Sequence, residues 1–355
     1  MQKFIHCADV HLGSKMESKL PKAKAEQRRA EVRNTFHRMV EYAKAEGVRA
    51  ILLSGDIFDS DRPLKRDKEF FYDVVKENPE IDFLYLRGNH DSQESYTEEG
   101  LSNLKTFSTE WSGYDYGEVY ICGLEIAREN AQSLYTTLKL DKDRKNLVML
   151  HGDAVNTTGV DKVHIGKLAD KNIDYLALGH IHSYSENKLD DRGRYAFSGC
   201  LEGRGFDEIG EKGFVLLEID EGVKSAFVPF AQRTIHEIEV DVTGTENGYA
   251  AYQMVKSQVK FQAADLYRIH LTGEVAYESE TLAEDVERLL ATESYFISVK
   301  NRTARKIDPA AYEGDASLRG EFVRMVLAKT DIDDARKREI ITLGLKALAG
   351  QEVEV

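Results

Sequence analysis

The chain has 355 residues, of which 48 are Lys or Arg and 62 are Asp or Glu, so its formal charge is −14. An apolar share of 42% and only 5 prolines indicate a globular protein of two or three domains without long disordered linkers. The acidic total argues against a bulk polyanion binder of the histone kind, although local positive charge can still bind nucleic acid.

The cysteine content and the N-terminus point to a cytoplasmic protein. Cys7, Cys122 and Cys200 cannot all pair, and none has a CxxC spacing, which is typical of a reducing compartment. The first residues, MQKFIHCADVHLG, lack the pattern of a signal peptide. No apolar run approaches the roughly 18 residues of a membrane helix, so we expect no membrane partner.

Short apolar runs, which we interpret as buried strands, recur through the first 183 residues. Each run ends in a cluster that contains Asp, Asn, Gly or His. Helices are predicted at 23–46, ending before Gly47, and at 66–77. The five runs with their clusters are 3–11, 48–59, 81–91, 146–154 and 173–183.

The alternation of strands and helices predicts a mostly parallel sheet that is covered by helices. Ligands of such sheets bind beyond the carboxyl ends of the strands, which is where the clusters occur. Three later short runs, within residues 194–230, predict a second and more antiparallel sheet.

The pattern changes near residue 233, which indicates a further domain. Residues 236–302 predict a compact βαβαβ unit, and residues 315–349 predict two helices. We therefore expect a domain at 1–235, a small domain at 236–308 and a C-terminal helical segment at 309–355. The sequence leaves open whether the two helices pack only on their own domain or dock a partner.

The clusters at the strand ends combine hard oxygens with imidazoles, a mixture that suits Mn, Fe or Zn better than Ca. Side chains i and i+2 of a strand point to the same side, so the Asp9–His11 and His180–His182 pairs converge if the chain stays extended. A glycine before three of the ligands allows tight turns and close backbone approach. Each short motif alone is more often structural, but their conjunction indicates one site. The candidate ligands are Asp9, His11, Asp56, Asn89, His151, His180 and His182.

The segments DVH, GDIFD, GNHD, HGD and GHIH resemble the five signature segments of the calcineurin-like metallophosphoesterases. The resemblance implies an α/β fold, a two-sheet αββα sandwich, with two divalent metal ions at the strand ends. Mn²⁺ is the expected metal, with Fe, Zn and Mg as alternatives. His90 would serve as the acid or phosphate contact, oriented by Asp91. The resemblance assigns Asp9, His11 and His182 to one ion, Asn89, His151 and His180 to the other, and Asp56 to both.

Two further segments resemble the SbcD-type DNA repair exonucleases, in particular their YhaO-like branch. These segments are GDxFDxxxP at 55–63 and the stretch 198–214 after GHIH. The small domain matches the position of a capping domain in that group, and the C-terminal helices match the segment that docks on an SbcC-like coiled-coil ATPase. The resemblance implies a metal-dependent DNA nuclease whose partners are DNA, such an ATPase and a second copy of the chain.

Other functions stay open at this point. Some members of the wider nuclease family carry His at the position of Asp59, which leaves the balance of exonuclease and endonuclease action undecided. A small-molecule phosphodiesterase or phosphatase of the same superfamily is the alternative. The full ligand set argues against a scaffold without catalysis.

A basic stretch follows the first motif. Residues 15–38 contain eight basic and three acidic residues, a local charge of +5. A solvated helix face explains this charge without function, whereas contact with the phosphate backbone of DNA explains it with function. The candidate DNA contacts are Lys15, Lys22 and Lys24 from this stretch and Arg204 from the segment after GHIH.

Overall fold

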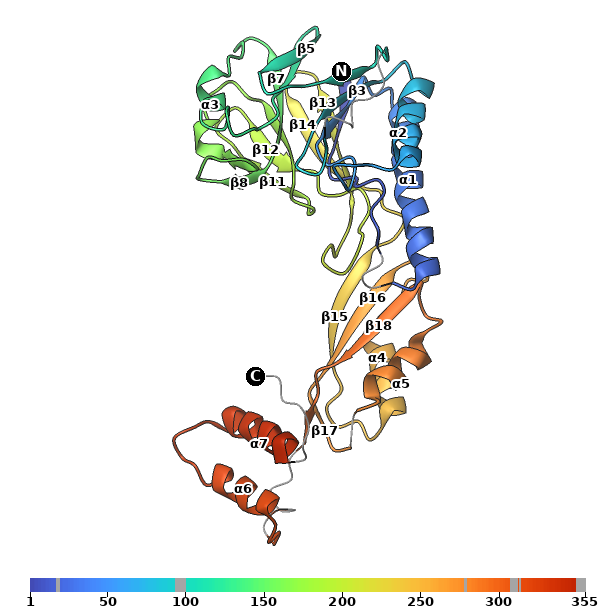
Figure 1. Ribbon diagram of the computed structural model, residues 1–355, viewed down its shortest axis with the longest axis vertical. Coiled ribbons are helices and arrows are strands. Elements are labelled where there is room, and N and C mark those ends of the chain that lie inside the picture. Colours follow the sequence, from blue (N-terminus) through green and yellow to red (C-terminus); the bar gives the residue numbers. More distant parts are fainter. Residues whose placement is uncertain (17–19, 93–99, 278–279, 307–311, 313, 349–355) are drawn as a thin grey trace. The chain divides into compact units, whose positions relative to one another are not determined.

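The structure, a computed structural model, separates into two compact units, Met1–Ile235 and His236–Val355 (Figure 1). The described residues are all except 17–19, 93–99, 278–279, 307–311, 313 and 349–355. The predicted boundary at residue 309 and the last predicted residues of the helical segment therefore lie outside the described part.

The first sheet of the N-terminal unit has six strands in the order β14-β13-β1-β2-β3-β4. Strands β1 to β4 run parallel, and β13 and β14 continue the sheet antiparallel on the other side of β1. The strands are β1 (Gln2–Cys7), β2 (Ala50–Ser54), β3 (Asp82–Leu86), β4 (Leu104–Thr106), β13 (Gly213–Ile219) and β14 (Val223–Pro229).

The second sheet has six strands in the order β11-β12-β10-β7-β6-β5, parallel in its centre and antiparallel at both edges. The strands are β5 (Ser112–Tyr116), β6 (Val119–Gly123), β7 (Lys145–His151), β10 (Tyr175–Gly179), β11 (Ser185–Lys188) and β12 (Arg194–Phe197).

The prediction that residues 194–230 form a separate, more antiparallel sheet is wrong. β12 pairs parallel with β10, and β13 pairs with β1 in the other sheet. Phe214 packs toward the helices while Val215 packs toward the second sheet, so β13 needs a position that is covered on both faces. A short apolar run predicts a strand but does not specify the sheet edge with which it pairs.

Alternation along the strands sends neighbouring side chains into different cores. Ile5 of β1 faces the core beneath the helices α1 (Lys22–Ala45) and α2 (Lys65–Glu77), whereas Phe4 faces the core between the sheets. A third core covers the outer face of the second sheet. The layers are thus helices, sheet, sheet and a second covering layer, as the αββα prediction requires. That covering layer contains α3 (Leu134–Thr137), β8 (Asp153–Val155), β9 (Lys162–His164) and η2 (Ile165–Lys167).

The C-terminal unit contains a three-stranded sheet, β15-β16-β18, which packs with two helices around its own core. The elements β15 (Ile235–Asp241), α4 (Gly248–Gln258), β16 (Leu266–Thr272), α5 (Leu282–Leu290) and β18 (Phe296–Asn301) follow in the predicted order. β17 (Glu274–Val275) and β19 (Ala304–Arg305) form a short parallel pair. The helices α6 (Leu318–Leu327) and α7 (Asp334–Leu348) pack together through Val323, Val326 and Ile341.

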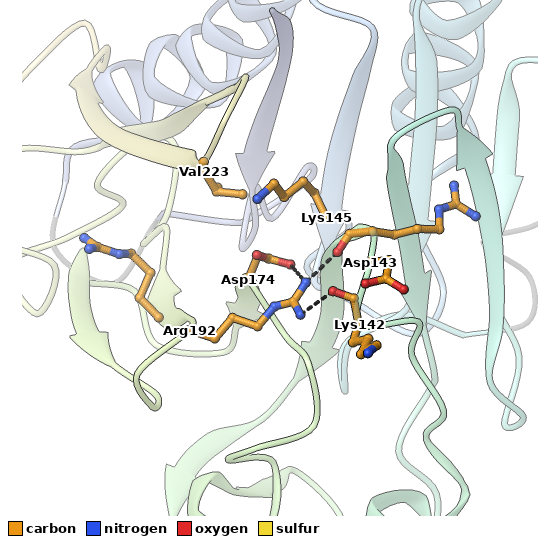
Figure 2. Close-up of a pocket in the computed structure, with 9 residues that line it drawn as sticks. Lys142, Asp143, Lys145, Asp174, Arg192 and Val223 are labelled. Atoms are coloured by element: carbon orange, nitrogen blue, oxygen red, sulfur yellow. Dashed lines mark hydrogen bonds and ion pairs between the residues drawn. The ribbon is translucent and has the colours of Figure 1, made fainter.

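The loops at the two ends of the strands of the second sheet differ in chemistry. At the N-terminal ends of its strands a cavity of about 470 Å³ is lined by the loops that precede β7, β10 and β12 and by the turn between β13 and β14 (Figure 2). There Arg192 donates to the carbonyls of Lys142 and Arg144 and pairs with Asp174 at 2.9 Å, which fastens the loops together. The predicted metal ligands lie at the opposite, C-terminal ends of the strands.

Within the described residues, no helix has the length and apolar character needed to cross a membrane.

Candidate metal centre

Left-handed turns at the strand ends deliver the predicted ligands. Asp9, His11 and Asp56 have φ between +50° and +53°, and His180 has φ +97°. Asp9 and His11 converge as predicted. The expectation that they do so along an extended strand is wrong, because β1 ends at Cys7 and the following residues turn. Such backbone costs of order 1–3 kcal/mol per residue and concentrates at functional sites.

Glycines make the close approach of these turns possible. A Cβ atom on Gly88 would lie 2.2 Å from Asp56 Oδ1, and one on Gly179 would lie 2.0 Å from Ser54 O. The backbone N–H of Asp9 donates to Gly55 O at 3.0 Å and so ties the loop after β1 to the loop after β2. The sequence prediction of close backbone approach at these glycines is confirmed.

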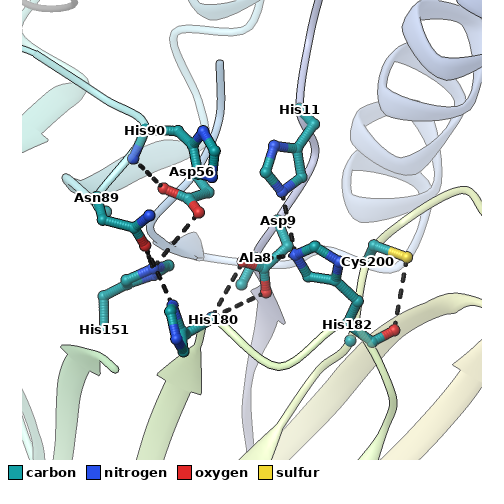
Figure 3. Close-up of polar contacts among 12 residues, drawn as sticks. Ala8, Asp9, His11, Asp56, Asn89, His90, His151, His180, His182 and Cys200 are labelled. Atoms are coloured by element: carbon teal, nitrogen blue, oxygen red, sulfur yellow. Dashed lines mark hydrogen bonds and ion pairs between the residues drawn. The ribbon is translucent and has the colours of Figure 1, made fainter. Parts of the chain in front are cut away.

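One half of the site, which we call the first half, consists of Asp9, His11 and His182. Their donor atoms all lie within 4.8 Å of one another. The Nε2 atoms of His11 and His182 face each other at 3.2 Å, and His182 Nε2 lies 4.0 Å from Asp9 Oδ1 (Figure 3). The chain at His182 is held by Lys212, whose Nζ donates to the His182 carbonyl at 2.8 Å.

The second half consists of Asn89, His151 and His180, with Asp56 beside them. His151 donates from Nδ1 to Ser54 O at 2.9 Å, which directs Nε2 to Asn89 Oδ1 at 3.0 Å and Asp56 Oδ2 at 3.5 Å. His180 Nδ1 lies 3.1 Å from the same Asn89 oxygen, and the backbone N–H of His180 donates to Asp9 (Figure 3). A second candidate cluster, Asp9 with Asp56 and His151, links the two halves.

The electrostatics of this arrangement suit a cation. Burial raises the pKa of Asp56, but the hydrogen bond and charge of His151 outweigh it and hold that pKa well below its usual range. Burial lowers the pKa of His151, but Asp56 and Asp9 raise it to about 9. His151 Nε2 thus faces only acceptor oxygens, a position that needs either a proton or a metal ion. The donor set, with its imidazoles and carboxylates, fits divalent transition metals.

His90 and Asp91 lie beside the centre but make different contacts. The backbone N–H of His90 donates to Asp56 Oδ1 at 2.9 Å, while its ring is exposed and lies 5.2 Å from the ring of His11. Asp91 accepts from the backbone N–H groups of Gly88 and Phe58 at 3.1 and 3.0 Å. Asp91 therefore joins the loops after β2 and β3, and its predicted contact with the His90 ring stays a prediction.

A comparison with known protein families identifies the family of the N-terminal unit. The model of the family described as calcineurin-like phosphoesterase matches residues 2–184, which include all seven candidate ligands. The chain belongs to the calcineurin-like phosphoesterase family. The family of the first prediction is thereby confirmed, and with it the two-sheet fold and a hydrolase of phosphoesters.

Curated relatives of this phosphoesterase are similar at low identity. It is 27% identical to the DNA double-strand break repair protein Mre11 of Sulfurisphaera tokodaii over 53% of its own length and 51% of that protein. It is 24% identical to the Mre11 protein of Sulfolobus acidocaldarius, over 84% and 82% of the two chains. The uncharacterized metallophosphoesterase YhaO of Bacillus subtilis is 30% identical, over 71% and 66%. The chain thus spans about half the length of the first relative.

The predicted DNA contacts differ in exposure. Lys15 and Lys22 of the phosphoesterase are exposed, whereas Lys24 is half-buried and its pKa is lowered by burial and by Arg233. Beside Asp59 a cavity of about 400 Å³ has four basic side chains in its lining. These side chains are Lys15, Arg29, Arg62 and Arg66.

The basic stretch 15–38 is less positive toward solvent than its composition indicated. Arg28 is fully buried and bonds Glu31, Glu202 and the carbonyl of Gly203. Arg28 thus anchors α1 to the segment that carries Arg204. Lys19 and Glu17 of the same count lie outside the described residues.

Sequence reasoning missed a shell of charged groups around the first half. Asp59 Oδ1 lies 3.2 Å from His11 Nδ1, and Glu208 Oε1 lies 2.7 Å from His182 Nδ1. Arg204, predicted as a DNA contact, pairs with both carboxylates. No spacing in the sequence connects residue 208 with residue 182, so only the fold reveals this contact.

Proposed function

We propose that the chain is a metal-dependent DNA nuclease that hydrolyses phosphodiester bonds and takes part in DNA repair. The observation that carries the proposal is the convergence of all seven predicted ligands at one edge of the sandwich. Two of the relatives described above are named as DNA double-strand break repair proteins, which supports DNA as the substrate class.

Two divalent cations, with Mn²⁺ as the expected metal and Fe, Zn or Mg as alternatives, fit the donors. When bound, they would neutralise developing charge on the phosphoryl oxygens and activate a water molecule. Asp9, His11 and His182 would hold one cation, and Asn89, His151 and His180 the other, with Asp56 shared between them.

The remaining residues would handle the leaving group and the substrate loop. The exposed ring of His90 lies beside the buried floor of the site and is available to donate a proton to the leaving oxygen. Asp91 would keep His90 in place indirectly, because it fixes the backbone of the loop through Gly88 and Phe58. The floor excludes water since Asp9, Asp56 and His151 are buried.

DNA would lie along the basic side chains next to the first half of the site. Lys15 and Lys22 would contact phosphates, with Lys24 as a weaker contact because it is half-buried. Arg204 is a fourth candidate, although its guanidinium already bonds two carboxylates. Charge reversal at Lys15 and Lys22 should weaken binding to all DNA sequences alike and flatten its salt dependence.

The C-terminal unit would serve as capping domain and partner contact. The proposed partner is an SbcC-like coiled-coil ATPase, which would dock on α6 and α7. Leu318 and Met325 of α6 are exposed apolar side chains that suit such an interface. A homodimer and a cytoplasmic location belong to the same proposal.

Digestion of an end-labelled DNA duplex with Mn²⁺, run beside a generic phosphodiester reporter, tests the proposed function. The expected result is cleavage of both substrates by the wild type and of neither by Asp56→Asn. Turnover of the reporter without action on duplex or single-stranded DNA, even with a coiled-coil ATPase added, would contradict a nuclease and favour a small-molecule phosphodiesterase.

A further inference from the structure

A chain of charged groups surrounds the two histidines of the first half on the side away from their facing Nε2 atoms. Asp59 Oδ1 lies 3.2 Å from His11 Nδ1, and Glu208 Oε1 lies 2.7 Å from His182 Nδ1. Both rings therefore have a carboxylate at one nitrogen and the centre of the site at the other. The second half has no such carboxylate at His151, whose Nδ1 bonds the Ser54 carbonyl.

Arg204 connects the two carboxylates. Its Nη1 donates to Asp59 Oδ1 at 2.8 Å, and its Nε and Nη2 donate to Glu208 Oε1 at 3.0 and 2.5 Å. Its backbone N–H also donates to Glu208 Oε2 at 2.7 Å. Glu208 is 4% exposed, so every oxygen it presents is fixed by Arg204 or His182. One guanidinium thus sets the positions of both carboxylates.

His182 is held at its outer nitrogen by the same two groups. Nδ1 lies 2.7 Å from Glu208 Oε1 and accepts a hydrogen bond from Arg204 Nη2 at 3.2 Å. Arg204 Nη2 carries two N–H groups, and the other donates to Glu208 Oε1 at 2.5 Å. His11 Nδ1 lies 3.2 Å from Asp59 Oδ1, to which Arg204 Nη1 donates. The outer nitrogens of both rings thus face one network around Arg204, and the two Nε2 atoms face the centre of the site.

We propose that Asp59 and Glu208, joined by Arg204, are positioning residues that hold the rings of His11 and His182 so that both Nε2 atoms are directed at one cation. This proposal rests on the proposed metal site but not on DNA as the substrate. A carboxylate at the outer nitrogen also raises the basicity of a ligating imidazole. Arg204 thus acts on the metal through the two histidines, and its part in DNA binding is secondary.

The Mn²⁺ affinity of the full-length protein provides the test. Asp59→Asn, Glu208→Gln and Arg204→Ala should each weaken Mn²⁺ binding at one of two sites by about 10–100-fold, as loss of such supporting contacts does elsewhere. Arg204→Lys should restore only part of the affinity, because an ammonium group cannot bridge both carboxylates in the same way. Asp59 is 26% exposed in its side chain, so Asp59→Asn remains informative if Glu208→Gln fails to fold.

A double-mutant comparison and a matched control separate positioning from other roles. If Arg204 couples the two carboxylates, the combined effect of Asp59→Asn and Glu208→Gln should be additive in an Arg204→Ala background and non-additive with Arg204 present. Arg194→Ala removes an arginine that pairs with Glu186 away from the site and should leave Mn²⁺ affinity unchanged.

The outcomes distinguish this proposal from the proposed nuclease function. Unchanged Mn²⁺ affinity in Arg204→Ala, with a flatter salt dependence of DNA binding, would overturn the positioning role and make Arg204 a phosphate contact. The predicted losses of Mn²⁺ affinity, together with no cleavage of DNA, would support the positioning role and reject the nuclease.

Discussion

The two halves of the metal centre are supported in different ways. In the first half the outer nitrogens of His11 and His182 face the carboxylates of Asp59 and Glu208. In the second half the outer nitrogen of His151 faces a backbone carbonyl, and a side-chain amide lies between two imidazoles. Side-chain substitutions can therefore change the contacts that hold the ligands of the first half, whereas the contacts of the second half depend on the path of the backbone.

The two halves also depend on different segments of the chain coming together. The first half requires residues 9–11, 59, 182 and 204–208 to meet, so it assembles only when both sheets and the loop before β13 are in place. The second half depends on Gly88 and Gly179, which let loops from the two sheets approach each other. Substitutions of different kinds should therefore disable each half.

Gly88→Ala should have the largest effect, because the new Cβ would lie 2.2 Å from Asp56 Oδ1 and 2.6 Å from the backbone nitrogen of Asp56. We expect phosphodiesterase turnover to fall by about 10²-fold or more, since a 1 Å misplacement can already cost that much. Kinetics with the phosphodiester reporter measure the effect, and circular dichroism checks the fold. Gly222→Ala is the matched control, because a Cβ there meets open space.

His90→Ala should lower turnover by about 10²-fold while the metal content stays near that of the wild type, because the imidazole would donate a proton without holding a cation. Steady-state kinetics and elemental analysis of the purified protein measure the two quantities. Loss of metal in this variant would show that His90 belongs to one of the halves as a ligand, and normal turnover would exclude it as the acid.

Arg28→Met should destabilise the protein by about 3–5 kcal/mol, since it leaves Glu202 and Glu31 buried with fewer partners. It should also weaken the first half of the site, because Arg28 donates to Gly203 O next to Arg204. Urea unfolding of the metal-free protein measures the change. Lys44→Met on the same helix breaks an exposed pair with Glu80 and should leave the free energy of unfolding close to that of the wild type. Equal losses of stability in both variants would contradict the role of Arg28 as the residue that anchors α1.

The sequence predicted the elements and the candidate ligands better than the contacts around them. Strand-end clusters such as GNHD place Asn89 and His90 correctly at one edge, because the ends of parallel strands meet there. The sheet of β13 and the left-handed φ of Asp9 and His11 were not predictable, since pairing and strain depend on residues far along the chain. Arg28 shows the same limit, because its charge indicated a surface while its partners bury it.

His6→Gln should have the smallest of these effects, a change in how the stability of the fold depends on pH. His6 Nδ1 bonds the hydroxyl of Tyr175 and so joins β1 to β10, the strands that precede ligands of both halves. Burial lowers the pKa of His6 to about 3, so between about pH 3 and pH 6.5 the unfolded state binds more protons than the folded state. Stability that is present above pH 6.5 is therefore lost on acidification, by about 2 kcal/mol at pH 5 from this residue.

Unfolding of the metal-free protein at pH 7 and pH 5 measures this loss in the wild type and in His6→Gln. The other groups that titrate in this range are the same in both proteins, so the difference between them isolates His6. The variant should lose about 2 kcal/mol less stability on acidification than the wild type. An identical pH dependence would mean that His6 takes up a proton within the folded state.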